Sequence, residues 1–284
     1  MAARILLLCD NAPRRESRAR LFTQSSMAEP RPEPLVRSSL ADKPQSAAFS
    51  PLYRQIKALL LQSLQQGEWK PGELIPSELD LAARFQVSQG TVRKAVDELA
   101  AEHMLQRRQG RGTFVSTHNE ARVRFRFLRL APDQESDAQP AQSRILSCKR
   151  LRAPLDIARV LDLRTGETVV AIRRLLSFGD VPSVVDDIWL PGGVFKGLTA
   201  EVLARNRGPL YALFETEFGV SMVRADEKIR AVAANEDAAS ILRIDQGTPI
   251  LQVDRLSYSY GDRPVEIRRG WYLTDRYHYR NSLN

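Results

Sequence analysis

Serine, threonine and arginine residues gather between Ser77 and Gly112 in a pattern suited to holding phosphates and base edges of nucleic acid. Ser77 and Ser88 each precede a segment with helical spacing, where a hydroxyl can cap the first main-chain N–H groups. The N–H groups at such a helix start also attract anions. The chemistry indicated is binding of a polyanion, with Arg93 and Lys94 on the outward side of the second of these segments.

A second group of basic residues lies further along, in what the pattern predicts to be a β-hairpin. Residues 104–108 and 113–115 are expected to form two short strands, joined by a turn at 109–112. Arg108 and Arg111 would lie at its tip. Gly110 and Gly112 would let the tip approach a nucleic-acid backbone closely, because glycine has no Cβ.

Three helices must position these groups. Apolar residues at helical spacing predict helices at 52–66, 77–85 and 89–99, with Pro51 at the first turn of the first and a tight turn at 86–88. Two helices joined by such a turn and followed by a basic hairpin predict a winged helix-turn-helix over residues 48–117, whose third helix would enter the major groove. The alternative is a three-helix packing module with a solvated basic turn.

The C-terminal half combines strands and helices. Strands are expected at 145–151, 168–178, 182–190, 222–231, 250–260 and 264–272, and helices at 155–161, 209–218 and 235–242. The glycine-aspartate pairs at 179–180 and 261–262 predict hairpin turns, so the domain of residues 144–284 is expected to be antiparallel. Residues 118–143 are expected to be a linker. Residues 1–47 are expected to be a disordered tail, or alternatively a basic arm that touches DNA.

One charged residue interrupts an otherwise apolar face in each of three strands: Arg174, Asp186 and Glu227. A buried charge is costly unless it is paired. These residues therefore indicate either a pocket that orients a polar ligand or an internal salt bridge such as Arg174–Asp186. The pattern alone leaves both open.

The bulk properties are those of an ordinary globular chain. Its 284 residues carry a formal charge of +8, spread as +3 over residues 1–45, +2 over 46–118 and +3 over 119–284. No apolar run reaches the length of a membrane span. Two distant cysteines, Cys9 and Cys148, do not suggest a disulfide framework, so a reducing, cytoplasmic setting without membrane partners is expected.

The N-terminal motifs resemble the GntR superfamily signature. They are Pro76-Ser77-Glu78-Leu79, Leu81-Ala82, Phe85-Gln86-Val87-Ser88, Thr91-Val92-Arg93-Lys94-Ala95, Leu99 and Gly110-Arg111-Gly112-Thr113-Phe114-Val115. The resemblance implies a homodimeric regulator on a near-palindromic operator in double-stranded DNA. By the same resemblance, the residues expected to contact DNA are Ser77, Ser88, Gln89, Thr91, Arg93, Arg108, Arg111 and Gly112. Many relatives carry a basic residue in place of Gln89 and a bulkier one in place of Gly90, so the operator is expected to differ.

The C-terminal motifs resemble the UTRA effector domain of the HutC-type branch. They include Arg174-Leu175, Val181-Pro182, Glu227-Lys228-Ile229, Gly247-Thr248-Pro249 and Pro264-Val265-Glu266. The implied fold class is α+β: the winged helix-turn-helix, then a chorismate-lyase-like six-stranded antiparallel sheet with flanking helices. The family's pocket positions correspond to Arg174, Asp186, Tyr211, Glu227, Glu266 and Tyr272.

Two departures from that family bear on the ligand. Leu176 and Pro209 replace an arginine and a serine that commonly hold an anionic end of the ligand. A sugar phosphate is therefore less expected than a ligand with amine, imidazole or hydroxyl donors.

These motifs and residues leave three possible functions. A ligand-responsive transcription factor, usually a repressor, is the expectation, with a small-molecule effector and no cofactor. An enzyme is disfavoured because the three histidines, His103, His118 and His278, are scattered without metal-ligand or catalytic spacing. An architectural DNA-binding protein is the third possibility, and its affinity for DNA would not respond to an effector.

Overall fold

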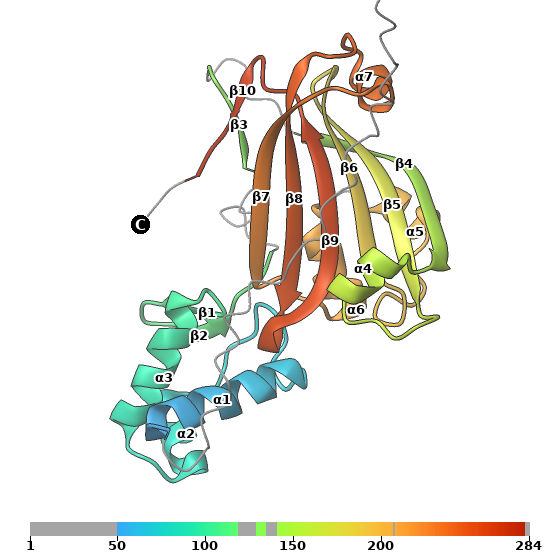
Figure 1. Cartoon of the computed structure of the whole chain (residues 1–284). Coiled ribbons are helices and arrows are strands. Elements are labelled where there is room, and N and C mark those ends of the chain that lie inside the picture. Colours follow the sequence, from blue (N-terminus) through green and yellow to red (C-terminus); the bar gives the residue numbers. More distant parts are fainter. Residues whose placement is uncertain (1–49, 119–128, 135–140, 207, 282–284) are drawn as a thin grey trace, which may run out of the picture. The chain divides into compact units, whose positions relative to one another are not determined.

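The computed structural model describes residues 50–118, 129–134, 141–206 and 208–281 (Figure 1). The expected tail of residues 1–47 and most of the expected linker lie outside these ranges. The described residues form a helical N-terminal module and a C-terminal sheet domain.

Three helices build the N-terminal module: α1 (Leu52–Gln65), α2 (Glu78–Phe85) and α3 (Gln89–Ala101). Ser77 caps α2 in a reciprocal box with Asp80, in which each side chain accepts from the other residue's main-chain N–H. Ser88 caps α3 by accepting from the Thr91 N–H at 3.2 Å. Between the helices, Gln86 adopts a left-handed backbone conformation with φ of 54° and ends α2. The tight turn between α2 and α3 follows from these caps.

The wing is an antiparallel hairpin of β1 (Leu105–Arg108) and β2 (Gly112–Val115), in which Arg108 pairs with Gly112. An Arg111 N–H to Arg108 carbonyl hydrogen bond of 2.9 Å closes the turn. Gly112 has φ of 102°, and a Cβ there would lie 2.7 Å from Leu74 Cδ1. A glycine is therefore required where the wing begins its return strand.

A continuous apolar core holds the helices and the wing together. Its fully buried members come from every element of the module: Ile56, Leu60, Leu64, Ile75, Leu81, Val92, Ala95, Val96, Leu99, Leu105 and Val115. The stripe on α3 is the one expected from the spacing of its apolar residues. On α1, by contrast, Leu52 and Leu59 are exposed, so only part of its apolar pattern faces the core.

The C-terminal domain is a six-stranded antiparallel sheet in the order β4-β5-β6-β9-β8-β7. The strands are β4 (Ala141–Arg152), β5 (Thr168–Phe178), β6 (Val181–Pro191), β7 (Arg224–Ala233), β8 (Pro249–Ser259) and β9 (Arg263–Tyr272). This confirms the expected fold class. The hairpin turn at Gly179-Asp180 joins β5 to β6, and a short 3₁₀ segment (Tyr260–Asp262) joins β8 to β9.

Helices cover both faces of the sheet (Figure 1). On one face, α5 (Ala200–Arg205) and α6 (Leu210–Phe218) pack on Ile172 and Ile188. On the other face, α4 (Leu155–Val160) packs near Val169, and α7 (Glu236–Leu242) packs near Val185. Because both faces carry helices, the residues of β5 and β6 are buried or half-buried apart from Val181 at the start of β6, and these strands show little polar alternation.

Four elements depart from the sequence expectation. Helix α5 was not expected, and neither was the small sheet of β3 (Leu130–Pro132) with β10 (Tyr277–Tyr279). Strand β3 and the first residues of β4 fall in the range expected to be a linker. On β7, Ile229 was expected on the same apolar, inward face as Glu227, but it is 45% exposed.

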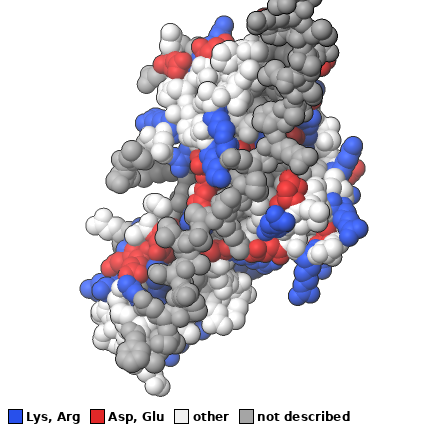
Figure 2. Space-filling model, viewed as in Figure 1, with Lys and Arg blue, Asp and Glu red and all other residues white. Residues whose placement is uncertain are grey.

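The described surface carries mixed charge. Figure 2 shows Lys and Arg side chains interspersed with Asp and Glu on the face it presents. This agrees with the even spread of the net charge along the chain. Within the four described ranges, no helix combines the length and the apolar character needed to cross a membrane.

Candidate functional site

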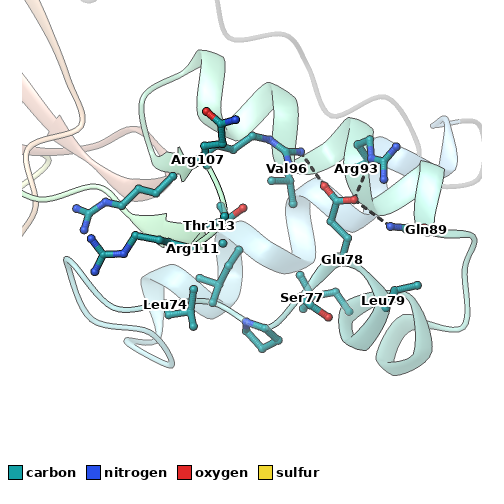
Figure 3. A pocket seen from close by; sticks show the side chains of 17 residues that line it. Leu74, Ser77, Glu78, Leu79, Gln89, Arg93, Val96, Arg107, Arg111 and Thr113 are labelled. Carbon is teal, nitrogen blue, oxygen red and sulfur yellow. Dashed lines mark hydrogen bonds and ion pairs between the residues drawn. The ribbon is translucent and has the colours of Figure 1, made fainter.

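A hollow of about 680 Å³ lies between the N-terminal end of α2, the start of α3 and the wing (Figure 3). Its lining includes six residues expected on DNA: Ser77, Gln89, Arg93, Arg108, Arg111 and Gly112. Residues of α3, the helix expected to enter the major groove, and residues of the wing therefore line one concave surface. Its shape and its arginines are suited to a strand of a nucleic-acid duplex.

Glu78, at the first position of α2, organises this hollow. Its Oε2 accepts from Arg93 Nε at 2.9 Å and from Gln89 Nε2 at 3.3 Å. Its Oε1 accepts from Arg107 Nη2 at 2.8 Å, and that nitrogen also donates to Asp97 at 2.7 Å. The carboxylate therefore links α2, α3 and the wing strand β1, as the dashed lines of Figure 3 show in part.

The electrostatics of Glu78 follow from these contacts. Burial by itself would raise the pKa of its carboxyl, but the hydrogen bonds and charges of Arg93 and Arg107 hold the pKa below its usual value. The carboxylate is therefore ionised at neutral pH and neutralises part of the positive charge of the hollow.

Two residues expected on DNA, Ser88 and Thr91, are not among those that line the hollow. Ser88 and Thr91 stand at the start of α3, with their hydroxyl oxygens 2.9 Å apart. Arg108 stacks its guanidinium over the Phe114 ring at 4.4 Å. Arg111 and Gly112 are exposed at the wing tip. Six of the eight positions therefore line the hollow, and the other two, Ser88 and Thr91, lie at the start of α3.

In the C-terminal domain, a cluster of charged side chains lies between the sheet and α6. Arg174 on β5 donates to Asp186 on β6, with Nε to Oδ2 at 3.2 Å. Arg268 Nη1 reaches the same oxygen at 3.5 Å. The internal salt bridge considered from the sequence is therefore present, and both of its residues are buried.

The cluster continues across β9, β8 and β7. Arg268 pairs with Glu266 at 2.9 Å, and the Tyr211 hydroxyl donates to the same carboxylate oxygen at 2.9 Å. Arg255 pairs with Glu227 at 2.5 Å. Tyr279 on β10 also donates to Glu227. All six residues expected at an effector pocket belong to this cluster or touch it.

Burial and pairing set the pKa values of the cluster in opposite directions. Burial alone would raise the pKa of Asp186, but the guanidiniums of Arg174 and Arg268 hold it below the usual 3.8. Burial raises the pKa of the Tyr211 and Tyr272 hydroxyls, so both remain protonated hydrogen-bond donors. Among the described residues, Asp186 Oδ1 has no hydrogen-bond partner although it is buried.

Gly270 makes room for this oxygen. A Cβ at Gly270 would lie 2.8 Å from Asp186 Oδ1 and 2.4 Å from a ring carbon of Tyr272. Asp186 and Gly270 are cross-strand neighbours, so the missing side chain leaves the Asp186 carboxylate and the Tyr272 ring in close apposition.

Three members of the cluster were missed from the sequence: Arg255, Ser257 and Arg268. Reading alternate residues along the last two long strands would have found them, because Arg255 and Ser257 share one face of β8 and Glu266 and Arg268 share one face of β9. No trio of His, Cys, Asp or Glu side chains among the described residues is arranged to hold a metal ion.

A winged helix-turn-helix joined to a sheet domain with a buried polar cluster defines a DNA-binding regulator with a ligand-binding domain. Residues 52–115 match the model of bacterial regulatory proteins of the gntR family, and residues 138–278 match the UTRA domain. The chain belongs to the GntR family of transcription regulators and carries a UTRA domain. That family consists of DNA-binding regulators rather than enzymes.

Similar proteins share most of the chain. An HTH-type transcriptional regulator of Mycobacterium tuberculosis is 34% identical over 80% of this chain and 83% of its own length. The HTH-type transcriptional repressor NagR of Bacillus subtilis is 27% identical over 82% of this chain and 96% of its own. The ligand-binding domain of a GntR-family regulator from Bordetella bronchiseptica, a crystal structure, is 66% identical over 57% of this chain and 100% of its own, with a TM-score of 0.56.

Proposed function

We propose that the chain is a HutC-type repressor that acts as a homodimer in the cytoplasm, where bacterial DNA lies. A small metabolite bound in the C-terminal cluster would release it from its operator. The observation that carries this proposal is the cluster itself. Among the described residues, the domain buries Arg174, Asp186, Arg255, Glu266 and Arg268 beside its apolar core, and the half-buried Glu227 pairs with Arg255.

Burying these charged groups costs free energy. Replacing buried ion pairs by apolar residues is often neutral or stabilising, so such pairs are weak evidence for a purely structural role. A network of charges with tyrosine hydroxyls beside it is, in contrast, well suited to orient a polar ligand. The cluster is thus better explained by ligand binding than by stability.

Asp186 suggests the chemistry of the effector. Its Oδ1 has no partner among the described residues, and a carboxylate oxygen only accepts hydrogen bonds. A ligand with an amine, imidazole or hydroxyl donor would satisfy it. The arginines are already paired with carboxylates, which disfavours a ligand held mainly through a phosphate.

The proposed DNA contacts are those of the hollow and its edge. Ser77, Ser88 and Thr91 would meet phosphates at the starts of α2 and α3. Arg93 and Gln89 would face the major groove, and Arg108, Arg111 and Gly112 would place the wing on the minor groove. In a dimer, two such surfaces match a near-palindromic site.

Coupling between the two sites must be reciprocal. If the effector weakens operator binding by some factor, the operator weakens effector binding by the same factor. The test uses the intergenic DNA upstream of the gene as the operator probe. A metabolite panel is first screened by thermal shift on the full chain, and each hit is then added to a DNA-binding titration.

We expect a metabolite with an amine, imidazole or hydroxyl donor to stabilise the protein and to weaken its binding to the intergenic DNA. Stabilisation by sugar phosphates alone would contradict the effector class. A stabilising ligand that leaves DNA affinity unchanged would contradict regulated release and favour an architectural role.

A further inference from the structure

An exposed leucine stands in the DNA-facing hollow. Leu79 is the second residue of α2, and it is 64% exposed although every other large apolar residue of α2 turns toward the core or its edge. It lines the hollow together with Gln89, the first residue of α3. Figure 3 shows both side chains on the same side of the hollow, with Glu78 beside them. Leu79 contributes little to the folded core, and its side chain is open to an external partner.

Glu78 fixes the orientation of Gln89. The side-chain amide of Gln89 donates one N–H to Glu78 Oε2, at a distance of 3.3 Å. A carboxylate can only accept, so the contact identifies which end of the amide faces Glu78. The Gln89 carbonyl oxygen and its second N–H are thereby left side by side for another partner.

That pair of groups matches one base better than the others. In the major groove, adenine presents an N6 donor next to an N7 acceptor, and a glutamine amide bonds to both. Guanine presents two acceptors and suits an arginine instead. The thymine of an A·T pair adds a C5-methyl group, which is the apolar contact that an exposed leucine can supply.

Arg93 is less suited to this reading role. Its Nε is engaged by the same Glu78 oxygen, which leaves the terminal nitrogens for a phosphate or for a second, less specific contact. Glu78 also places a negative charge in the hollow, which repels phosphates from the position between Leu79 and Gln89. At that position, the negative charge of Glu78 therefore favours contact with a base edge over contact with a phosphate.

We infer that Leu79 and Gln89 read A·T base pairs in the major groove of each half-site, with Gln89 bonding to adenine and Leu79 contacting a thymine methyl group. This inference rests on the proposed DNA-binding function and specifies the class of sequence that the hollow recognises.

The test begins with selection of duplexes from a random library by the full-length wild-type protein. The selected duplex is then resynthesised with single substitutions: 7-deazaadenine, which lacks the N7 acceptor, or deoxyuridine, which lacks the thymine methyl group. Affinities are measured for the wild type, Gln89→Ala, Leu79→Ala and the control Leu52→Ala. Leu52 is 51% exposed in the same module and does not line the hollow.

Each half-site is expected to contain a position where 7-deazaadenine weakens wild-type binding by about tenfold or more. Gln89→Ala should lose this sensitivity. Deoxyuridine should weaken the wild type and Leu52→Ala alike, by several-fold, and should have no effect on Leu79→Ala.

Selected half-sites without such an A·T position, or equal sensitivity of Gln89→Ala and the wild type, would overturn the inference while the DNA-binding function stood. Failure of the wild type to bind any duplex would refute that function, and the inference with it.

Discussion

Replacing Asp186 by asparagine isolates the electrostatic contribution of the buried cluster. The change keeps the shape of the side chain and removes one negative charge, so Arg174 and Arg268 lose the carboxylate that both of them contact. Both arginines are 7% exposed, and water cannot replace the lost partner. Removing one partner of a buried pair costs about 3–5 kcal/mol.

This loss should appear as a lower melting temperature of the C-terminal domain. A domain of this size loses roughly 3–4 °C per kcal/mol, so the expected decrease is about 10–20 °C. Calorimetry of the full chain would measure it. Asp226→Asn is the matched control, because Asp226 pairs with Arg224 at 2.6 Å on the surface. The control should change stability by less than about 1 kcal/mol.

The pH dependence has a definite sign. The pKa of Asp186 in the folded protein lies below its unfolded value near 3.8, so its stabilising effect is present above that pH. The effect is lost as the pH falls through the folded-state pKa. The difference between the wild type and Asp186→Asn should therefore be constant from pH 7 to pH 5 and should shrink below about pH 4. A melting temperature unchanged at pH 7 would refute the buried network as described.

Three further changes test other parts of the structure. Ser88→Ala removes the hydroxyl that caps α3 and should destabilise the N-terminal module by about 1 kcal/mol in urea unfolding; an unchanged midpoint would contradict the cap. Gly270→Ala brings a methyl group to 2.4 Å from the Tyr272 ring and should cost about 1–3 kcal/mol, whereas a neutral effect in the same assay would show that the ring can move away. Arg111→Ala should weaken binding to all duplexes similarly and lower the salt dependence by about one phosphate contact, and a loss confined to one sequence would instead make Arg111 a base reader.

The sequence predicted the elements whose signals are local. Ser77 with Asp80 three positions later predicted the cap of α2, Ser88 predicted the cap of α3, and strand β5 was predicted with its observed bounds, Thr168–Phe178. In these cases the residues that decide the structure are close neighbours in the chain. These caps and this strand can therefore be predicted without knowledge of the remaining fold.

Other features depend on distant residues. Strands β3 and β10 have three residues each and pair only with each other, although Leu130 and Tyr279 are far apart in the sequence. Helix α5 has six residues and buries one of them fully, Leu203, so no helical period can emerge. Short elements of this kind are stabilised by tertiary packing, which a local pattern does not contain.

The two candidate sites also contain some residues that local motifs predict and others that only the fold brings together. The residues expected to contact DNA could be named because they lie in and around a contiguous motif. The Arg174–Asp186 pair could also be named from the sequence, but the partner of Glu227 required the strand register, since Arg255 lies opposite Glu227 and also opposite Arg268 on its other side. The role of Glu78 was equally hidden, because its partners come from α3 and β1.

The equal number of positive and negative groups in the cluster has a consequence for how its specificity can diverge. A single substitution that adds or removes a charge there leaves a charged group without its counter-charge, at a cost comparable to much of a domain's stability. A second substitution of opposite sign, or a ligand that carries the missing charge, restores the balance. Related regulators with different effectors should therefore differ at these six positions in compensating pairs, so that each change of charge on one strand is matched on a neighbouring strand.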